Sequence, residues 1–507
     1  MTKGTHLANV VTAQLNLAIS TLGAFVVTPV ILNGLGDSAY GGWLLLNSFI
    51  VYLRFLDLGN TAGTVKYGAG ALGRGDAAEV RATLNTSAAI FTTCGIVTAL
   101  ATLAIARVLP TMYPSFASNH TNAILALGGA MALEMLFRPF VAAIRIRLLY
   151  WVYDLAEIIT YLIFKFGLVF YFAQTRGLTY ELLAYLTLCE TLVRLGAMGV
   201  AAAFALPAVR RLNPFGVSRA MIHKIGGMGV AVTIIMVADI VRFQLDAGVI
   251  GYFMPDKPES IAIYGIGARV ANMAAGMIGV IAGVLFPRFA ALAEVGDHDA
   301  TYDLQKRTSY YTGLACAYIL VNLVVLGPQF LTIWLHKPWT GRSATILLIF
   351  IPGYWLGLLA GGSTSALAGA GRLKRLAMFV VVEAAVNFAV SIILVKPLGI
   401  VGVALGTAIP LTAFQIFVLP VLIQRETGMR VADYWRMHAR GLQIGGIYLV
   451  LIAVLALNPT SEITRFLMKA TLSTCVFAGL VLVMEPTARL AVVNGLARWR
   501  RAGTAEA

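Results

Sequence analysis

Several charged side chains of this sequence stand inside long apolar stretches, and these are the residues whose chemistry could matter most. Lys165 and Arg269 have no opposite charge three or four positions away along the chain. A charge at the centre of a bilayer costs about 2.5–3.5 kcal/mol on the insertion scale, so such residues face protein or water and mark substrate or ion pathways. Cations without an acidic neighbour would attract an anionic substrate such as a phosphate or pyrophosphate.

Acidic side chains in comparable positions could bind a coupling ion. Asp239, Arg242 and Asp246 occur at i, i+3 and i+7, which places one cation between two acids and leaves an acid in excess. Glu383 is followed one helical turn later by Asn387, which offers a further oxygen ligand. We expect Asp239, Glu383 and Asn387 to serve proton or sodium coupling.

Other charges have a structural interpretation that remains open. Glu134/Arg138 and Glu190/Arg194 are i,i+4 pairs that could neutralise each other on one helix face, and Arg54/Asp57 is an i,i+3 pair. With that alternative kept, the substrate-binding candidates are Arg54, Arg138, Lys165, Arg242 and Arg269. The ion-coupling candidates are Asp57, Asp239, Glu383 and Asn387.

No catalytic residue and no metal site are expected. The four cysteines stand alone in apolar stretches, which is typical of small buried hydrophobic residues. The G-x-G-x-x-G match at 68–73 follows no strand and opens no βαβ unit, so nucleotide binding is rejected. We expect no cofactor other than a coupling ion, Na⁺ or H⁺.

The elements that must position these charges are membrane-spanning helices. Of the 507 residues, 59% are hydrophobic and 12% charged, whereas soluble domains carry about 25% charged residues. Apolar runs of about 20 residues cross a bilayer, and their continuity disfavours a strand-built barrel. We predict an all-α polytopic membrane protein with about fourteen spans. They lie near 7–32, 38–58, 82–107, 121–143, 149–173, 180–206, 221–247, 261–287, 308–335, 343–369, 375–395, 398–423, 440–458 and 465–484.

The basic residues are distributed unevenly between the two sides of the membrane. The net charge of +15 could suggest nucleic acid as a partner. However, the termini and even-numbered loops carry 26 lysines and arginines and the odd-numbered loops about eight, which is the positive-inside pattern. We therefore expect a multi-pass protein of the cytoplasmic (inner) membrane with both termini cytoplasmic, and no nucleic-acid partner.

The two halves of the sequence look related. Tyr40-Gly41 corresponds to Tyr264-Gly265, Gly75-Asp76 to Gly296-Asp297, and Glu157 to Glu383, at nearly constant offsets. A six-helix unit present twice in the same orientation is a transporter architecture, with the substrate site between the lobes. We predict an N-terminal lobe at 1–212, a C-terminal lobe at 213–425, and a final helix pair with a basic cytoplasmic tail at 426–507.

Three motifs carry a resemblance to a known family. They are the Tyr-Gly start and Leu-Asp-Leu-Gly turn of 40–59, the run from Ile263 through Arg269 to Phe289, and Ala-Gly-Ala-Gly-Arg-Leu-Lys at 368–374. Together they resemble the oligosaccharide flippase (Wzx-type polysaccharide transporter) family of the MOP exporter superfamily, which is related to lipid II flippases. The resemblance implies two lobes around a cationic cavity faced by Arg54 and Arg269. It also implies alternating access, with an acid on the seventh helix and acid and amide groups on the eleventh for the ion.

The implied function is export of a polyprenyl-pyrophosphate-linked oligosaccharide for surface polysaccharide biosynthesis. The implied partners are this undecaprenyl-linked substrate, membrane lipid, and a polysaccharide polymerase with its chain-length machinery, the chain itself being a monomer. A lipid II flippase, a multidrug/cation antiporter of the same superfamily, and a membrane polysaccharide polymerase or glycosyltransferase remain alternatives. The short external loops disfavour the enzymes, and the cations disfavour the drug exporter.

Overall fold

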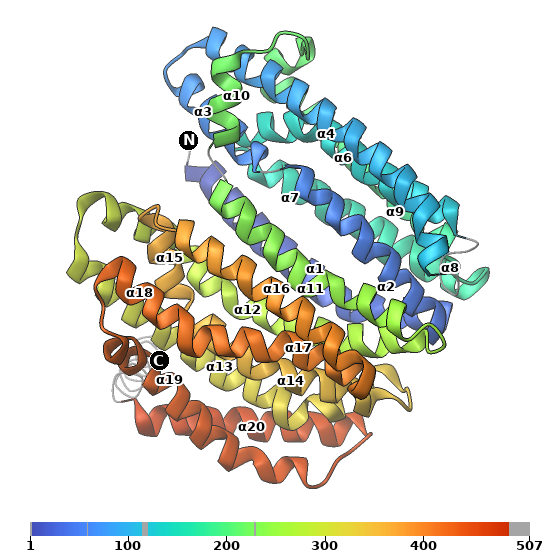
Figure 1. Cartoon of the computed structure of the whole chain (residues 1–507), viewed down its shortest axis with the longest axis vertical. Helices are drawn as coiled ribbons and strands as arrows, with labels where there is room; N and C mark the ends of the chain where they lie inside the picture. The colour runs from blue at the N-terminus through green and yellow to red at the C-terminus, as the bar shows by residue number, and fades with distance from the viewer. Residues whose placement is uncertain (1–2, 58, 114–119, 228–229, 486–507) are drawn as a thin grey trace, which may run out of the picture. The chain divides into compact units, whose positions relative to one another are not determined.

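The computed structural model describes residues 3–57, 59–113, 120–227 and 230–485, and every regular element in these ranges is a helix (Figure 1). In chain order they are α1 (Lys3–Leu35), α2 (Asp37–Tyr52), η1 (Leu53–Asp57), α3 (Asn60–Gly73), α4 (Ala77–Met112), α6 (Thr121–Ile146), α7 (Tyr150–Tyr161), η2 (Leu162–Leu168), α8 (Val169–Thr175), α9 (Tyr180–Ala205), η3 (Pro207–Arg211), α10 (Arg219–Gly227), α11 (Val230–Phe253), α12 (Glu259–Val295), α13 (His298–Leu335), α14 (Thr340–Leu359), α15 (Gly361–Gly369), α16 (Lys374–Leu398), α17 (Ile400–Ala413), η4 (Phe414–Val418), α18 (Leu419–Thr427), α19 (Val431–Ile452), η5 (Ala453–Ala456) and α20 (Ile463–Met484).

The membrane-spanning character that the sequence predicts is confirmed. Within the described residues, 13 helical stretches are long and apolar enough to cross a membrane. Large apolar side chains such as Leu100 and Met468 are more than half exposed on them, as expected for surfaces that face lipid. Helix α11 occupies the predicted seventh span, but every 18-residue window of it contains Asp239, Arg242 and Asp246, which lowers its apolar character.

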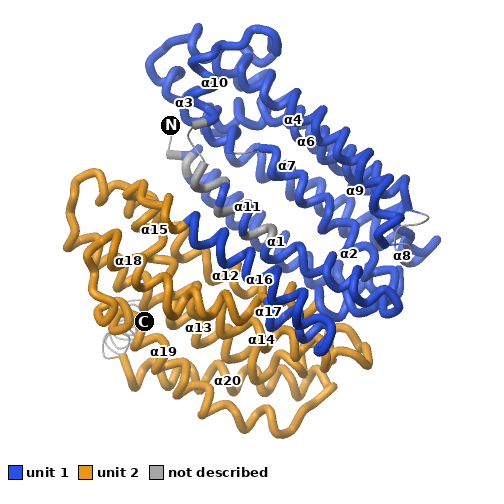
Figure 2. Tube along the Cα trace, in the orientation of Figure 1, with its two compact units in different colours: residues 1–265, 377–406 blue, residues 266–376, 407–507 orange. Residues whose placement is uncertain are grey.

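The chain forms two compact units, which Figure 2 distinguishes by colour. Unit 1 comprises residues 1–265 and 377–406, and unit 2 comprises residues 266–376 and 407–507. The units are defined by contacts between helices, whereas the predicted lobes 1–212 and 213–425 are defined by repeated sequence. The units do not test the lobes, which therefore stay a prediction.

In unit 1, α6 packs along both α4 and α9 (Figure 1). A buried apolar cluster that includes Val80, Leu84, Ile144 and Met198 joins these helices. Helix α4 begins at Asp76, whose Oδ1 accepts a hydrogen bond of 2.9 Å from the Glu79 amide, a standard N-terminal cap. This packing fixes the helices that carry the polar residues of unit 1.

In unit 2, α13 is the central helix and packs on α14, α19 and α20. A Cβ atom placed on Gly313 of α13 would lie 2.8 Å from the Cα of Gly441 on α19, so only glycine allows this approach of two backbones. The Tyr448 hydroxyl of α19 donates a hydrogen bond of 3.0 Å to the Ser473 carbonyl oxygen of α20, and Ser473 Oγ donates to Asn322 Oδ1 of α13 at 2.7 Å. The final helix pair is therefore attached to α13 by packing and by hydrogen bonds.

Three turns of the first half have counterparts 221 to 223 residues later with the same left-handed backbone. Gly75 and Gly296 both have φ +73, Leu148 (+58) corresponds to Gly371 (+69), and Gly177 (+78) to Gly399 (+58). After the first pair, Asp297 caps α13 through the Ala300 amide at 2.9 Å, as Asp76 caps α4. These equivalent turns support the interpretation that one helical unit occurs twice.

Candidate functional site

A buried ion pair joins α11 to α16 in unit 1. Arg242 and Glu383 form a salt bridge and are 7% and 5% exposed. The sequence placed two acids of the same helix beside Arg242, and the structure adds Glu383 from a different helix. Asp246 accepts a hydrogen bond from the hydroxyl of Tyr264 on α12. Removing one partner of such a pair is costly, because a buried charge is left without compensation.

The stripe that continues from Glu383 along α16 is polar and buried. Asn387 and Ser391 follow at successive turns and are 2% and 1% exposed. The Nδ2 of Asn387 is buried and makes no hydrogen bond with the described residues. An acid, an amide and a hydroxyl on one helix face offer oxygen atoms of the kind that a proton or a hard cation prefers. The side chain of Asp239 lies outside the described residues, so its predicted share in this site stays a prediction.

A second charged cluster, the N-half network, comprises Asn16, Glu134, Tyr153, Glu157 and Arg194. Arg194 of α9 forms salt bridges with Glu134 of α6 and, at 3.4 Å, with Glu157 of α7. Glu157 also accepts hydrogen bonds from Asn16 of α1 at 2.9 Å and from Tyr153 at 2.6 Å. The proposed neutralisation within single helices, Glu134 with Arg138 and Glu190 with Arg194, is therefore wrong. The charges are paired between helices, because the helices pack closely enough for these side chains to meet.

Lys165 stands in the π-helical turn η2 between α7 and α8. Its Nζ lies 3.3 Å from Glu190 Oε2 and donates to Thr187 Oγ1 at 3.2 Å, both on α9. The absence of an acid three or four residues away predicted an unpaired cation, and this prediction is wrong because the neighbouring helix supplies the acid. π-Helical turns are rare and often mark functional positions, since they turn a side chain out of regular register.

Asp57 ends η1 and organises the break in the second predicted span. Its Oδ1 accepts from the Thr61 amide at 3.0 Å and its Oδ2 from the Thr61 hydroxyl at 2.8 Å, so the carboxylate caps α3. Arg138 Nε lies 3.9 Å from Asp57 Oδ2, is buried, and makes no hydrogen bond with the described residues. Arg54, which the sequence paired with Asp57, is exposed and forms no ion pair within the described part of the chain.

Arg269 differs from the paired cations. It lies on α12 in unit 2, is partly buried, and has neither a hydrogen bond nor an ion pair with the residues that the structure describes. One turn later on the same helix, Asn272 accepts a hydrogen bond of 2.6 Å from Tyr354 of α14. Arg269, like Arg54, is thus a candidate whose charge is not compensated by its described surroundings.

Of the predicted site residues, the structure brings Arg242 together with Glu383 and Asp57 together with Arg138. Lys165 instead pairs with Glu190, which was not among the predicted site residues. Sequence reasoning missed the roles of Arg194, Tyr264 and Ser391. For Ser391 a signal existed, since it continues the spacing of four from Glu383 and Asn387. The partners on other helices left no such signal in the local sequence.

Comparison with known proteins shows likeness in structure only. The sequence matches no protein-family model, and no curated protein matches it. A multidrug resistance MATE family transporter of the MOP superfamily, inward-facing, is similar with a TM-score of 0.65 and 14% identity, over 84% of this chain and 99% of that one. The lipid II flippase MurJ, inward closed, is similar with a TM-score of 0.66 and 11% identity, over 93% and 99%.

A MOP superfamily transporter from Pyrococcus furiosus is also similar, with a TM-score of 0.56 and 16% identity over 86% of this chain and 99% of that one. Its description reports a binding pocket of reverse polarity and suggests a different function for that protein. At these identities the likeness concerns the fold. The chain therefore has the fold of the MOP superfamily transporters.

Proposed function

We propose that the protein exports a polyprenyl-pyrophosphate-linked oligosaccharide across the cytoplasmic membrane by alternating access, for surface polysaccharide biosynthesis. The fold supports transport, and the motifs of 40–59 and 263–289 favour the oligosaccharide flippases within that fold. The substrate is an anion, so its site must offer positive charge that the protein itself leaves uncompensated.

The observation that carries this proposal is an asymmetry between the charges within the spans. Each of the acids within the spans that are named and described above has a donor or a cation: Asp57, Glu134, Glu157, Glu190, Asp246 and Glu383. Arg54 and Arg269 have no such partner within the described residues. An exporter of organic cations would need the reverse, namely acids whose charge is free for the substrate.

Ion coupling is proposed at Glu383 and Asn387. A proton or a sodium ion at Glu383 would compete with Arg242 for the carboxylate, because the carboxylate cannot be fully shared between two cations in a buried place. A phosphate group at Arg242 would in turn release Glu383. The pair thus supplies two alternative arrangements, which is what a coupled cycle requires.

The test is transport in proteoliposomes that contain a fluorescent undecaprenyl-pyrophosphate oligosaccharide, with and without a proton or a sodium gradient. We expect gradient-dependent movement that Arg269→Ala and Arg54→Ala reduce at least tenfold, since each removes a charge-assisted contact of about 1.5–3 kcal/mol. Lysine at either position should restore part of it, as the charge returns without the bidentate geometry.

The control is Arg465→Ala, since Arg465 is 70% exposed and its one ion pair with a described residue is a surface pair of 3.1 Å with Glu462. Wild-type transport by both Arg269→Ala and Arg54→Ala would remove these residues from the site. Movement of lipid II alone would reassign the protein to lipid II flipping. Uptake of an organic cation without movement of any pyrophosphate lipid would assign it to drug export.

A further inference from the structure

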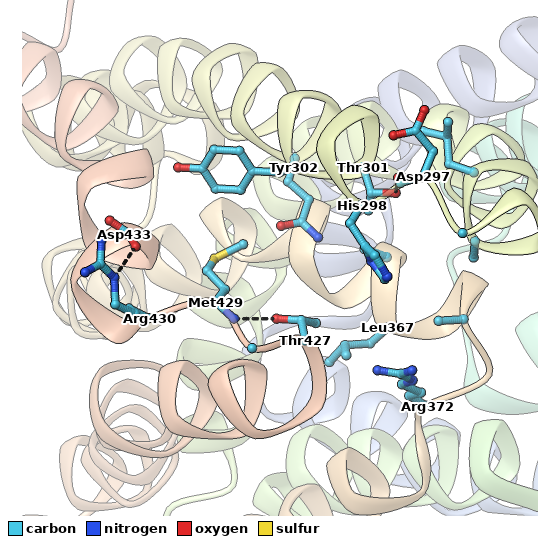
Figure 3. A pocket seen from close by; sticks show the side chains of 17 residues that line it. Asp297, His298, Thr301, Tyr302, Leu367, Arg372, Thr427, Met429, Arg430 and Asp433 are labelled. Carbon is cyan, nitrogen blue, oxygen red and sulfur yellow. Dashed lines mark hydrogen bonds and ion pairs between the residues drawn. The ribbon is translucent and has the colours of Figure 1, made fainter.

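A cavity of about 610 Å³ lies in unit 2, and none of the charged residues of the candidate site lines it. The end of α12, the first turns of α13 and the turns α15–α16 and α18–α19 line it (Figure 3). These turns belong to the side that the lysine and arginine bias assigns to the cytoplasm. The volume falls in the range of about 300–1,000 Å³ that is usual for small-molecule sites.

Gln305 of α13 lines this cavity and is 3% exposed. Its Oε1 is buried without a hydrogen bond, and no other described residue bonds its carboxamide. A buried amide without a partner destabilises the folded protein, so native proteins retain one where something else bonds it. The glutamine therefore points to a ligand with hydroxyl or amide groups.

The first half of the chain shows that packing does not require a glutamine here. Gln305 stands eight residues after the capping Asp297, and Leu84 stands eight residues after the equivalent cap, Asp76. Leu84 is fully buried in the apolar cluster of unit 1. The same position of the same local structure thus carries leucine in the first half and, in the second half, an amide that lines the cavity.

The rest of the lining combines hydroxyl groups with one uncompensated cation. Thr301 and Tyr302 share the cavity with Gln305. Figure 3 shows His298 and Arg372 on one side of it and the Arg430–Asp433 ion pair, of 2.9 Å, on the other.

Arg372 donates to the backbone carbonyl of Glu426, which orients its guanidinium, yet it has no carboxylate partner within the described ranges. A guanidinium in this state is suited to a phosphate. Leu367 and Ala366 add an apolar wall on which a sugar ring or glyceryl carbons can lie.

We propose that this cavity binds a phosphorylated polyol, with its phosphate at Arg372 and its hydroxyl groups at Gln305, Thr301 and Tyr302. Two sources carry this chemistry, a free sugar phosphate of the cytoplasm and the phosphoglycerol headgroup of a lipid. None of the residues proposed for transport lines this cavity, and its turns belong to the side predicted to be cytoplasmic, so a ligand there would act from that side.

The experiment measures binding to the purified full-length protein with one probe for each source. For the soluble source, glucose 1-phosphate is titrated into the protein in detergent by isothermal titration calorimetry. For the lipid source, the thermal melting midpoint is compared between nanodiscs that contain phosphatidylglycerol and nanodiscs of phosphatidylcholine alone. We expect one of the two to bind, and Gln305→Leu and Arg372→Gln each to weaken that binding tenfold or more. Arg375→Gln is the control, because Arg375 pairs with Glu426 at 3.0 Å outside the lining.

Gln305→Leu should fold, since the first half carries leucine at this place, and Arg372→Gln changes only an exposed side chain. Binding that neither variant weakens would overturn the proposal, as would no response to either probe. The proposal would also be overturned if inorganic phosphate bound as tightly as glucose 1-phosphate and Gln305→Leu had no effect. The cavity would then be a simple anion site.

Discussion

At the scale of single residues, the described charges within the spans are held mainly by partners on other helices. Arg194 reaches α6 and α7, Lys165 reaches α9, and Arg242 reaches α16. The residue types and their positions were predictable from sequence, because a charge stands out in an apolar run. Their partners were not, since spacing of three or four residues describes only one helix face, and the distances between helices depend on tertiary packing.

The Arg242–Glu383 pair provides a prediction for stability. Glu383→Gln should lower the melting midpoint strongly, because removing one partner of a buried pair costs about 3–5 kcal/mol. The double variant with Arg242→Gln should melt higher than Glu383→Gln alone, as no uncompensated charge then remains. Thermal melting in detergent measures both, with the exposed Glu462→Gln as the control. This account would be contradicted if the melting midpoint of the double variant fell by the full sum of two large decreases, one for each single variant.

At the scale of elements, the turns are more alike between the halves than the side chains around them. The left-handed residues fix the direction in which each following helix starts, and glycine reaches this conformation without strain. Leu148 is the exception, a leucine where the equivalent turn has Gly371. These glycines were visible in the sequence, but a left-handed leucine was not predictable, because an L side chain disfavours that conformation by about 1–2 kcal/mol.

The turns at Leu148 and Gly371 predict opposite effects of substitution on stability. Gly371→Ala should destabilise the protein by about 1–2 kcal/mol, whereas Leu148→Gly should be neutral or stabilising, because it removes the same strain. Gly129→Ala serves as the control, since Gly129 lies in α6 and an added Cβ meets no atom within 4 Å. Melting midpoints compare the three. Equal tolerance of alanine at Gly371 and Gly129 would argue against strain at the turn.

At the scale of the whole molecule, the spans were predictable because length and hydrophobicity are local properties of the chain. The helices extend beyond them, as α12 and α13 reach 37 and 38 residues, since a helix continues into water wherever its backbone remains hydrogen-bonded. The two packing units were not foreseen, because units follow contacts between distant segments, whereas the predicted lobes follow sequence repetition.

The side of the membrane on which each turn lies is a testable prediction at this scale. Ala78 and Gln174 are exposed near opposite ends of the spans of unit 1. In a cysteine-free variant, Gln174→Cys should react with a membrane-impermeant maleimide in intact cells, and Ala78→Cys only after permeabilisation, because the basic loops stay inside. Gel shift of the labelled protein measures this. Labelling of Ala78→Cys in intact cells would show that the protein has the opposite orientation in the membrane.

The contact between Gly313 and Gly441 has a consequence for the surrounding bilayer. Because α19 rests on α13 without intervening side chains, any displacement of α13 must carry α19 and α20 with it. Helix α20 exposes Met468 and Val483 by 67% and 72%, so this motion would push aside the lipid chains that cover them. The rate of the proposed transport should therefore depend on membrane viscosity and thickness, and not on the events inside the protein alone.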